Sequence, residues 1–149
     1  MSNFPNILLI DDNEDDYEAT LRGFKKNHFV SPVHWCKNGQ DALDYLKLKG
    51  KYATGRNVSR PNLVLLDLNM PGIDGKRVLT QIKQDKKLCS IPVVVFTTSS
   101  DARDVEQCYS IGASTYIQKP VSFEELTKTI RTIKDYWFDV ALLPSEKNM

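Results

Sequence analysis

The chain carries five short apolar runs, and each run stops at a polar or charged residue. They occupy residues 6–10, 32–36, 63–66, 92–96 and 114–118. The third run, LVLL, lies between Pro61 and the turn formers Pro71 and Gly72, and a short apolar run with such flanks is typical of a strand buried on both faces. We therefore predict five strands, with residues 63–66 in the centre of the sheet.

Segments of helical periodicity separate these runs. Residues spaced by three and four predict helices with one inward face after residue 12 (Tyr17, Thr20, Leu21, Phe24), after Asn38 (Ala42, Leu43, Leu46) and after Gly75 (Val78, Leu79, Ile82). A fourth helix is expected between an N-cap at Asp101 and a stop at Gly112, with Ala102, Val105 and Tyr109 on one face. Ser122 and Glu125 have the spacing of a capping box for a long last helix, whose inward stripe is Phe123, Leu126, Ile130, Ile133, Trp137 and Val140.

Strands that alternate with helices predict an α/β fold, a five-stranded parallel sheet that is doubly wound, (βα)5. A length of 149 residues suits a single domain, and we expect a core over residues 5–135 and a C-terminal extension over residues 136–149. Residues 50–61, GKYATGRNVSRP, have little periodicity and predict a long surface loop in which disorder concentrates.

Composition narrows the range of partners. The net charge is +1 with no basic block, which argues against nucleic acid or an anionic membrane as the main partner. The sequence contains no apolar stretch of about 20 residues and no signal-peptide pattern at its start, so we expect a cytoplasmic location. The three cysteines are widely spaced and form no CxxC pair, so they suggest reduced core residues rather than a disulfide or zinc framework.

Chemically distinctive residues follow four of the five predicted strands. They are Asp11 and Asp12, Asp67, Thr97 and Lys119. The carboxyl ends of parallel strands share one edge of a sheet, which is where open α/β sheets bind ligands. Clustered carboxylates repel one another unless a cation joins them, and hard oxygen ligands suit Mg²⁺. A hydroxyl and an ammonium beside such a metal are donors for an anion, so the set describes a phosphoryl site with an attacking carboxylate.

Each of these residues also has an ordinary structural explanation. An acidic doublet before a helix is commonly a dipole-favoured cap, Thr97 could be an ordinary strand-end hydroxyl, and Lys119 a solvated charge. Taken one at a time, those explanations are the more common ones. Their occurrence together at four strand ends favours a functional site.

The motifs resemble those of response-regulator receiver domains in two-component signalling. The matching stretches are the DD after the first strand, LLDLNMPGIDG, VFTTS and YIQKP, in that order, and the resemblance covers nearly the whole chain. The loop at 50–61 and the ending DYWFDVALLP further resemble single-domain regulators of cyanobacterial and bacterial phytochromes. The resemblance implies a flavodoxin-like strand order, 2-1-3-4-5. It also implies a signalling protein that accepts a phosphoryl group from a sensor histidine kinase and is not an enzyme in the ordinary sense.

The resemblance assigns a role to each site residue. Asp67 would accept the phosphoryl group, and Mg²⁺ would be bound by Asp12, Asp67 and the backbone carbonyl of Asn69, with Asp11 acting through water. Thr97 and Lys119 would contact phosphoryl oxygens, and Tyr116 would be the switch aromatic that follows Thr97. Asn69 and Ser99 occupy positions that tune phosphoryl lifetime, while Thr98 stands where a smaller residue is usual and puts the phosphorylation rate in question. The Lys119–Pro120 bond is cis in that family.

Three alternative functions share some of these features. A haloacid-dehalogenase-type phosphatase also forms an aspartyl phosphate, but it needs an early nucleophile with a second carboxylate two residues later, where this chain has Asn69. A flavodoxin-like flavin phosphate binder needs small hydroxyl residues after the first strand, and DDNEDD would repel phosphate. A receiver used only for docking would not need the complete set of side chains.

The end of the chain predicts self-association. Tyr136, Trp137 and Phe138 point to different sides of a regular helix, so they cannot all face one core, and Leu142 and Leu143 add apolar surface. A tail folded back over its own domain is the alternative. Because the regulators it resembles form symmetric dimers, we expect a homodimer through the fourth helix, fifth strand and last helix, with these five residues in the interface.

Overall fold

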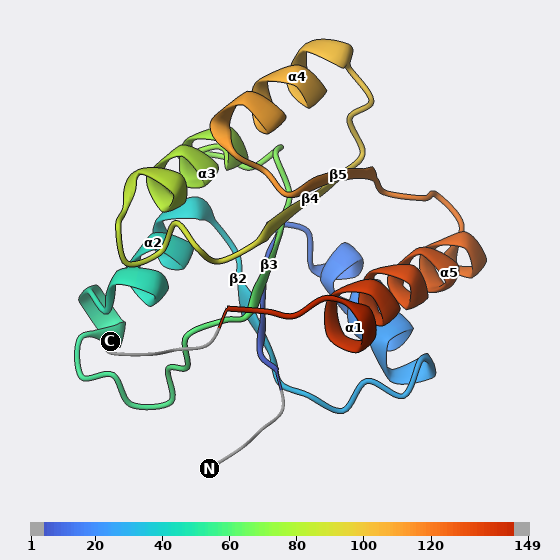
Figure 1. Ribbon diagram of the computed structural model, residues 1–149, viewed down its shortest axis with the longest axis horizontal. Coiled ribbons are helices and arrows are strands. Elements are labelled where there is room, and N and C mark those ends of the chain that lie inside the picture. Colours follow the sequence, from blue (N-terminus) through green and yellow to red (C-terminus); the bar gives the residue numbers. More distant parts are fainter. Residues whose placement is uncertain (1–4, 145–149) are drawn as a thin grey trace.

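The computed structural model describes residues 5–144 and has one central parallel sheet with helices on both faces (Figure 1). Its strands are β1 (Ile7–Ile10), β2 (Val33–Cys36), β3 (Leu63–Leu66), β4 (Val93–Thr97) and β5 (Thr115–Gln118). The order across the sheet is β2-β1-β3-β4-β5, so β3 is central. The predicted doubly wound five-stranded fold and its strand order are therefore confirmed.

Five α-helices connect and cover the strands. They are α1 (Glu14–Lys26), α2 (Gly39–Lys47), α3 (Gly75–Gln84), α4 (Ala102–Ile111) and α5 (Phe123–Lys134). Helices α1 and α5 lie on one side of the sheet and α2, α3 and α4 on the other (Figure 1). Each α-helix begins at a side-chain cap, and the predicted caps Asn38, Asp101 and Ser122 all accept a backbone N–H bond.

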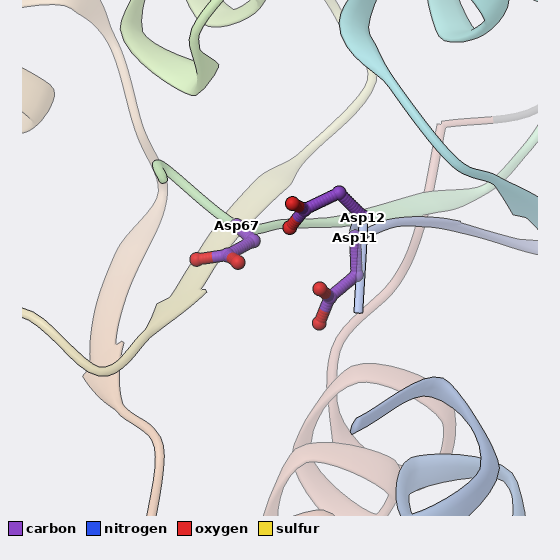
Figure 2. A group of neighbouring side chains, drawn as sticks. All are labelled: Asp11, Asp12 and Asp67. Carbon is purple, nitrogen blue, oxygen red and sulfur yellow. The ribbon is translucent and has the colours of Figure 1, made fainter. Parts of the chain in front are cut away.

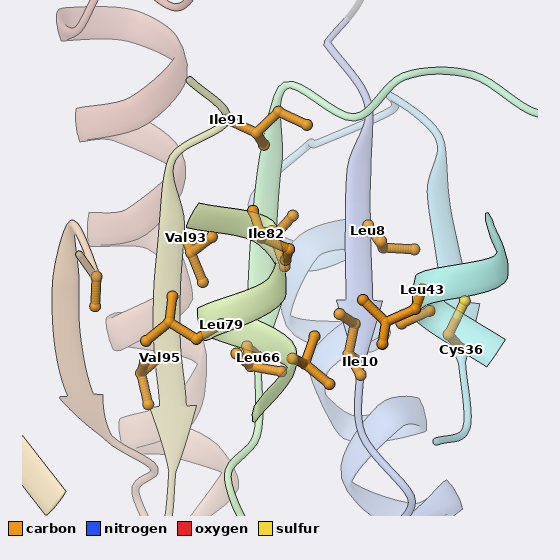
Figure 3. Packing of buried hydrophobic residues seen from close by; sticks show 14 of the residues in the cluster. Leu8, Ile10, Cys36, Leu43, Leu66, Leu79, Ile82, Ile91, Val93 and Val95 are labelled. Carbon is orange, nitrogen blue, oxygen red and sulfur yellow. The ribbon is translucent and has the colours of Figure 1, made fainter. Parts of the chain in front are cut away.

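Two apolar layers hold the helices to the sheet. The layer under α2 and α3 contains Leu8, Ile10, Val64, Leu66, Leu79 and Ile82, together with residues from β4 (Figure 3). The layer under α1 and α5 contains Leu9, Leu65, Phe24, Phe96 and Ile130. Strands β1, β3 and β4 are buried throughout, because each of them contributes side chains to both layers.

Helix α4 buries one residue, Cys108, against the core. Ala102 and Tyr109 are exposed, and Val105 is only partly covered. The helix covers the sheet near β5, at one edge (Figure 1). The face that Ala102, Val105 and Tyr109 share is therefore mainly turned to solvent, and Cys108 is the residue of α4 that the core buries.

The last helix changes its geometry before it ends. A π-helical turn, η2 (Asp135–Val140), follows α5. The wider turn brings both Trp137 and Phe138 against the apolar layer of α1 and α5, and the ring centroid of Phe138 lies 5.2 Å from that of Phe29. Val140, predicted to continue the inward stripe, is instead 71% exposed because the added residue per turn shifts the register.

The segment between α2 and β3 packs against the rest of the domain. It contains a short 3₁₀ turn, η1 (Gly50–Tyr52), and two side chains that pack on the core, Tyr52 and Val58. The Tyr45 hydroxyl donates to the Ser59 carbonyl at 3.1 Å and accepts from the Ser59 N–H at 3.2 Å. The predicted surface loop is therefore present, but with tertiary contacts that its composition did not indicate.

Candidate phosphoryl-acceptor site

Three carboxylates meet at the carboxyl edge of the sheet. Strands β1 and β3 pair in register up to Ile10 and Leu66, so the residues that follow them, Asp11 and Asp67, lie side by side. One carboxylate oxygen each from Asp11, Asp12 and Asp67 lies within 4.8 Å of the others. Figure 2 shows the three side chains around a common space. The structure thus brings together the three aspartates that the sequence singled out.

The cluster is partly removed from water. Asp11 and Asp67 are buried, whereas Asp12 is exposed to solvent. Burial raises the pKa of Asp11 despite the nearby Lys119 ammonium, and the charge of Asp67 adds to the rise. Burial disfavours the charged form of the Asp11 carboxyl, and a bound cation would offset that cost. Three carboxylate oxygens at this spacing fit a hard divalent cation such as Mg²⁺.

Lys119 is the buried cation of the site. Its Nζ lies 2.7 Å from Asp11 Oδ2, 3.1 Å from Asp16 Oδ2 and 3.8 Å from Asp67 Oδ2. Burial alone would lower the pKa of Lys119, but the surrounding carboxylates outweigh it and the pKa is raised, so the side chain stays charged. Asp16 was not predicted as a site residue; its only sequence signal is its place in the first turn of the helix, four residues after Asp12.

Thr97 contributes a hydroxyl without a partner. It ends β4, is fully buried, and its Oγ1 has no hydrogen-bond partner among the described residues. A buried hydroxyl that makes no bond costs about 1–3 kcal/mol. Backbone pairing fixes its place, because the Lys119 N–H donates to the Thr97 carbonyl at 2.6 Å. An unpaired donor at this edge of the sheet is what an anionic ligand needs.

A close backbone approach supports Asp67 from behind. Gly75 starts α3, and a Cβ at this position would overlap the Asp67 carbonyl and the Cα of Leu68. The Gly75 N–H donates to the Leu68 carbonyl at 3.0 Å. The intervening turn also needs a glycine, because Gly72 has a φ of 74°. Gly75 is therefore a structural requirement of the site that the sequence pattern alone did not identify.

Tyr116 is linked to the segment after Thr97. Its hydroxyl donates to the Ser99 carbonyl at 2.9 Å, and its N–H donates to the Tyr109 hydroxyl at 3.0 Å. The Ser99 hydroxyl in turn donates to Asp104 Oδ2 at 2.7 Å. Asn69 is exposed, with its N–H 3.5 Å from Asp67 Oδ1. The expected cis Lys119–Pro120 bond is absent, since no peptide bond within residues 5–144 is cis; trans is the isomer that X–Pro bonds favour intrinsically.

Comparison with known proteins defines the class. Residues 7–131 match the response regulator receiver domain family, and the chain belongs to that family. Response regulators with a receiver domain are signalling proteins. Within the described residues no helix is long and apolar enough to cross a membrane.

Individual relatives place the chain further within the family. It is 43% identical over 131 residues to the probable methanogenesis regulatory protein FilR2 of Methanothrix harundinacea, covering 88% of this chain and 82% of FilR2. It is 36% identical over 139 residues to the response regulator Rcp1 of Synechocystis, covering 93% of this chain and 92% of Rcp1. The crystal structure of the phosphorylated cyanobacterial phytochrome response regulator RcpA superposes with a TM-score of 0.89 at 36% identity, covering 95% of this chain and 99% of RcpA. The chain is thus similar to phytochrome response regulators, as expected.

Proposed function

We propose that this receiver domain accepts a phosphoryl group on Asp67 from a phosphohistidine of a sensor kinase. The carrying observation is that Asp67 lies within reach of both the acidic pair and Lys119 at the carboxyl edge of the sheet. The neighbouring strand ends in Thr97, whose hydroxyl has no partner among the described residues. In the transfer, an Asp67 carboxylate oxygen attacks phosphorus and forms a P–O bond. The P–N bond to the kinase histidine breaks, and the imidazole nitrogen keeps the electron pair and takes a proton.

The acidic cluster would hold Mg²⁺. We assign Asp12, Asp67 and the backbone carbonyl of Asn69 as direct ligands and Asp11 as a ligand through water, because Asp11 is already bonded to Lys119. The bound ion would neutralise phosphoryl oxygens as charge develops on them. A solved structure of Rcp1 in its Mn²⁺-bound form, 35% identical with a TM-score of 0.87, supports the binding of a divalent cation.

Lys119 and Thr97 would couple phosphorylation of Asp67 to a conformational change at the surface of the domain. A phosphoryl group on Asp67 would present new oxygens to the Lys119 ammonium and to the Thr97 hydroxyl, which otherwise has no partner within residues 5–144. Only such a differential interaction shifts a conformational equilibrium. Movement of Thr97 would change the segment up to Ser99, to which Tyr116 is bonded, and so alter the α4–β5–α5 face.

We infer that the partner is a phytochrome-type sensor kinase. The support is similarity to Rcp1 and RcpA over nearly the whole of each chain. The higher identity to FilR2, described as a methanogenesis regulatory protein, favours a second candidate, a kinase that responds to a chemical signal. Phosphotransfer profiling against the histidine kinases of the source organism distinguishes the two. Fastest transfer from a phytochrome kinase supports the first, and fastest transfer from a kinase without a chromophore domain overturns it.

We also propose a homodimer through the α4–β5–α5 face. Tyr136 and Leu142 are 52% and 98% exposed, and Leu143 is partly covered, so this end of the chain offers apolar surface. Trp137 and Phe138 pack on their own domain and would support the interface from behind. A two-fold contact would use each exposed side chain twice. Output would then come from protein contacts.

A further inference from the structure

Lys119 divides its ammonium group between two carboxylates on different elements. Its Nζ donates a hydrogen bond of 2.7 Å to Asp11, which follows β1, and another of 3.1 Å to Asp16 in the first turn of α1. The carboxylate of Asp67 lies farther from Nζ, at 3.8 Å, which is beyond hydrogen-bond distance. Two of the three ammonium protons are therefore directed away from the acceptor carboxylate.

The two partners of Lys119 differ in how easily water can replace the ammonium. The Asp11 side chain is 3% exposed, so its carboxylate would stay buried without a counter-ion if Lys119 moved away. The Asp16 side chain is 40% exposed, and water can solvate its carboxylate at little cost. A new anion beside Lys119 would consequently displace Asp16 rather than Asp11.

The start of α1 fixes where the Asp16 side chain lies. The Asp16 N–H donates to the Asn13 side chain at 3.0 Å, and the Asn13 N–H donates to Asp11 Oδ1, also at 3.0 Å. The first turn of α1 is thus bonded to the same carboxylate that binds Lys119 from the other side. Asp16 is held at the site by its backbone as well as by its ion pair.

Asp16 also has an ordinary structural explanation. Acidic side chains in the first turn of a helix interact favourably with the helix dipole, and Glu14 and Asp15 stand in the same turn. Of these three acids, only Asp16 forms a salt bridge within residues 5–144. The dipole accounts for an acid in this turn, but it does not account for the contact with Lys119.

We propose that Asp16 is a positioning residue that holds Lys119 toward α1 in the unphosphorylated protein and loses it to a phosphoryl group on Asp67. The inference rests on the proposed phosphorylation of Asp67. The hydrogen bond from Lys119 to Asp16 breaks, one from Lys119 to a phosphoryl oxygen forms, and no proton is transferred. Because Asp16 and the phosphoryl group compete for one ammonium, Asp16 weakens the binding of that group. In the phosphorylated protein the first turn of α1 loses its bond to Lys119.

Binding of beryllofluoride in the presence of Mg²⁺ measures this competition, because beryllofluoride on an aspartate is a stable analogue of the phosphoryl group. Full-length protein is titrated with beryllium at constant fluoride and Mg²⁺, and the backbone amide resonances next to Asp67 report occupancy. We expect Asp16→Asn to bind the analogue about two- to fivefold more tightly, the equivalent of one partly exposed ion pair. A residue that only supported the fold would weaken binding when it is replaced.

Two control variants separate the contact with Lys119 from the loss of a negative charge. Asp15→Asn removes the same charge from the neighbouring exposed position and should change the affinity by less than about 1.5-fold, because salt screens exposed charges. Asp16→Glu keeps a carboxylate within reach of Lys119 and should bind the analogue as the parent protein does. Equal tightening by Asp15→Asn or by Asp16→Glu would overturn the proposal, and so would unchanged or weaker binding by Asp16→Asn.

A spectroscopic signature follows the exchange of partners itself. In the parent protein the side-chain carboxyl carbon resonance of Asp16 should shift when beryllofluoride binds, because its counter-ion leaves. The corresponding resonance of Asp15, which forms no ion pair among the described residues, should not shift. An Asp16 resonance that stays in place at full occupancy would show that Lys119 keeps both of its bonds, and the proposal would be wrong.

The outcome also distinguishes this proposal from the proposed function. If the parent protein neither binds beryllofluoride nor takes up an acid-labile phosphoryl group from acetyl phosphate, phosphorylation of Asp67 is wrong and the role of Asp16 falls with it. If the parent and all three variants bind the analogue with equal affinity, only the role of Asp16 is wrong. Denaturant unfolding of each variant verifies that affinities are compared between folded proteins.

Discussion

At the scale of single residues, the site contains buried polar side chains that destabilise the fold when no ligand is bound. Thr97 buries a hydroxyl with no partner among the described residues, and burial raises the pKa of Asp11. Both features cost folding free energy, and a bound cation and phosphoryl group would remove the cost. Ligand sites commonly contain side chains that destabilise the free protein. Here such side chains lie at strand ends that converge on one point.

The first prediction follows from Thr97. Thr97→Val replaces the hydroxyl with a methyl group of similar size, so the free energy of unfolding without ligand should rise by about 1 kcal/mol. Thr97→Ser keeps the hydroxyl and is the matched control. Denaturant unfolding of both variants measures the change. A clear destabilisation by Thr97→Val in the absence of phosphate and Mg²⁺ would mean that the hydroxyl already has a partner.

The sequence located most of the site because strand ends are easy to recognise. Asp11, Asp67, Thr97 and Lys119 all follow apolar runs, and parallel pairing brings such ends to one edge. Asp16 and Gly75 were missed for different physical reasons. The contact of Asp16 with Lys119 depends on how α1 is oriented, and the role of Gly75 is a steric limit visible only with the Asp67 backbone in place.

At the scale of elements, the periodicity of the sequence was reliable where a helix covers the sheet broadly. Val78, Leu79 and Ile82 of α3 are fully buried as predicted. In α4 the residues that share the predicted face, Ala102, Val105 and Tyr109, are exposed or only partly covered, and the periodicity did not indicate that Cys108 would be the buried residue. The π-helical turn after α5 could not be predicted from apolar residues spaced by three and four. A π-helix has more residues per turn than an α-helix, so this spacing no longer marks one face.

The second prediction concerns the loop between α2 and β3. Tyr45→Phe removes the hydroxyl that both donates to and accepts from Ser59, and should lower the free energy of unfolding by about 1–2 kcal/mol. Amide hydrogen exchange should accelerate within residues 50–61, while the rate of phosphorylation is unchanged.

Tyr136→Phe is the control for Tyr45→Phe. It removes the same atom from an exposed ring that has no hydroxyl bond among the described residues, and it should not change stability. Slow exchange that persists across the loop in Tyr45→Phe would show that Tyr52 and Val58 suffice to hold it.

At the scale of the whole molecule, the phosphoryl site and the proposed dimer face share β5. Lys119 follows this strand into the site, and Tyr116 within it contacts both α4, through Tyr109, and the segment after β4. The end of the chain after α5 adds exposed apolar side chains, among them Tyr136 and Leu142. One strand therefore connects a chemical event at the sheet edge with a surface where copies of the chain would meet.

The third prediction tests that surface. Tyr136→Asp with Leu142→Asp should convert a dimer into a monomer in sedimentation experiments at tens of micromolar, because charge would be buried in the interface. Leu48→Asp alters an apolar residue of similar exposure to Tyr136 at the end of α2, on the opposite side of the sheet from α5, and should leave the dimer intact. Point changes are preferable to truncation before Tyr136, since Trp137 and Phe138 belong to the folded core. A parent protein that sediments as a monomer with and without a phosphoryl mimic would refute the dimer.

The account rests above all on Asp67 as the acceptor, and phosphotransfer from acetyl phosphate measures this directly. The parent protein should take up one acid-labile phosphoryl group in the presence of Mg²⁺ and none after chelation, because the acidic cluster needs a cation before an anion can approach. Asp67→Asn should take up none, whereas Asp74→Asn, which alters an exposed helix cap, should be labelled normally. Label of undiminished amount on Asp67→Asn, or uptake by the parent that is indifferent to Mg²⁺, would contradict the account.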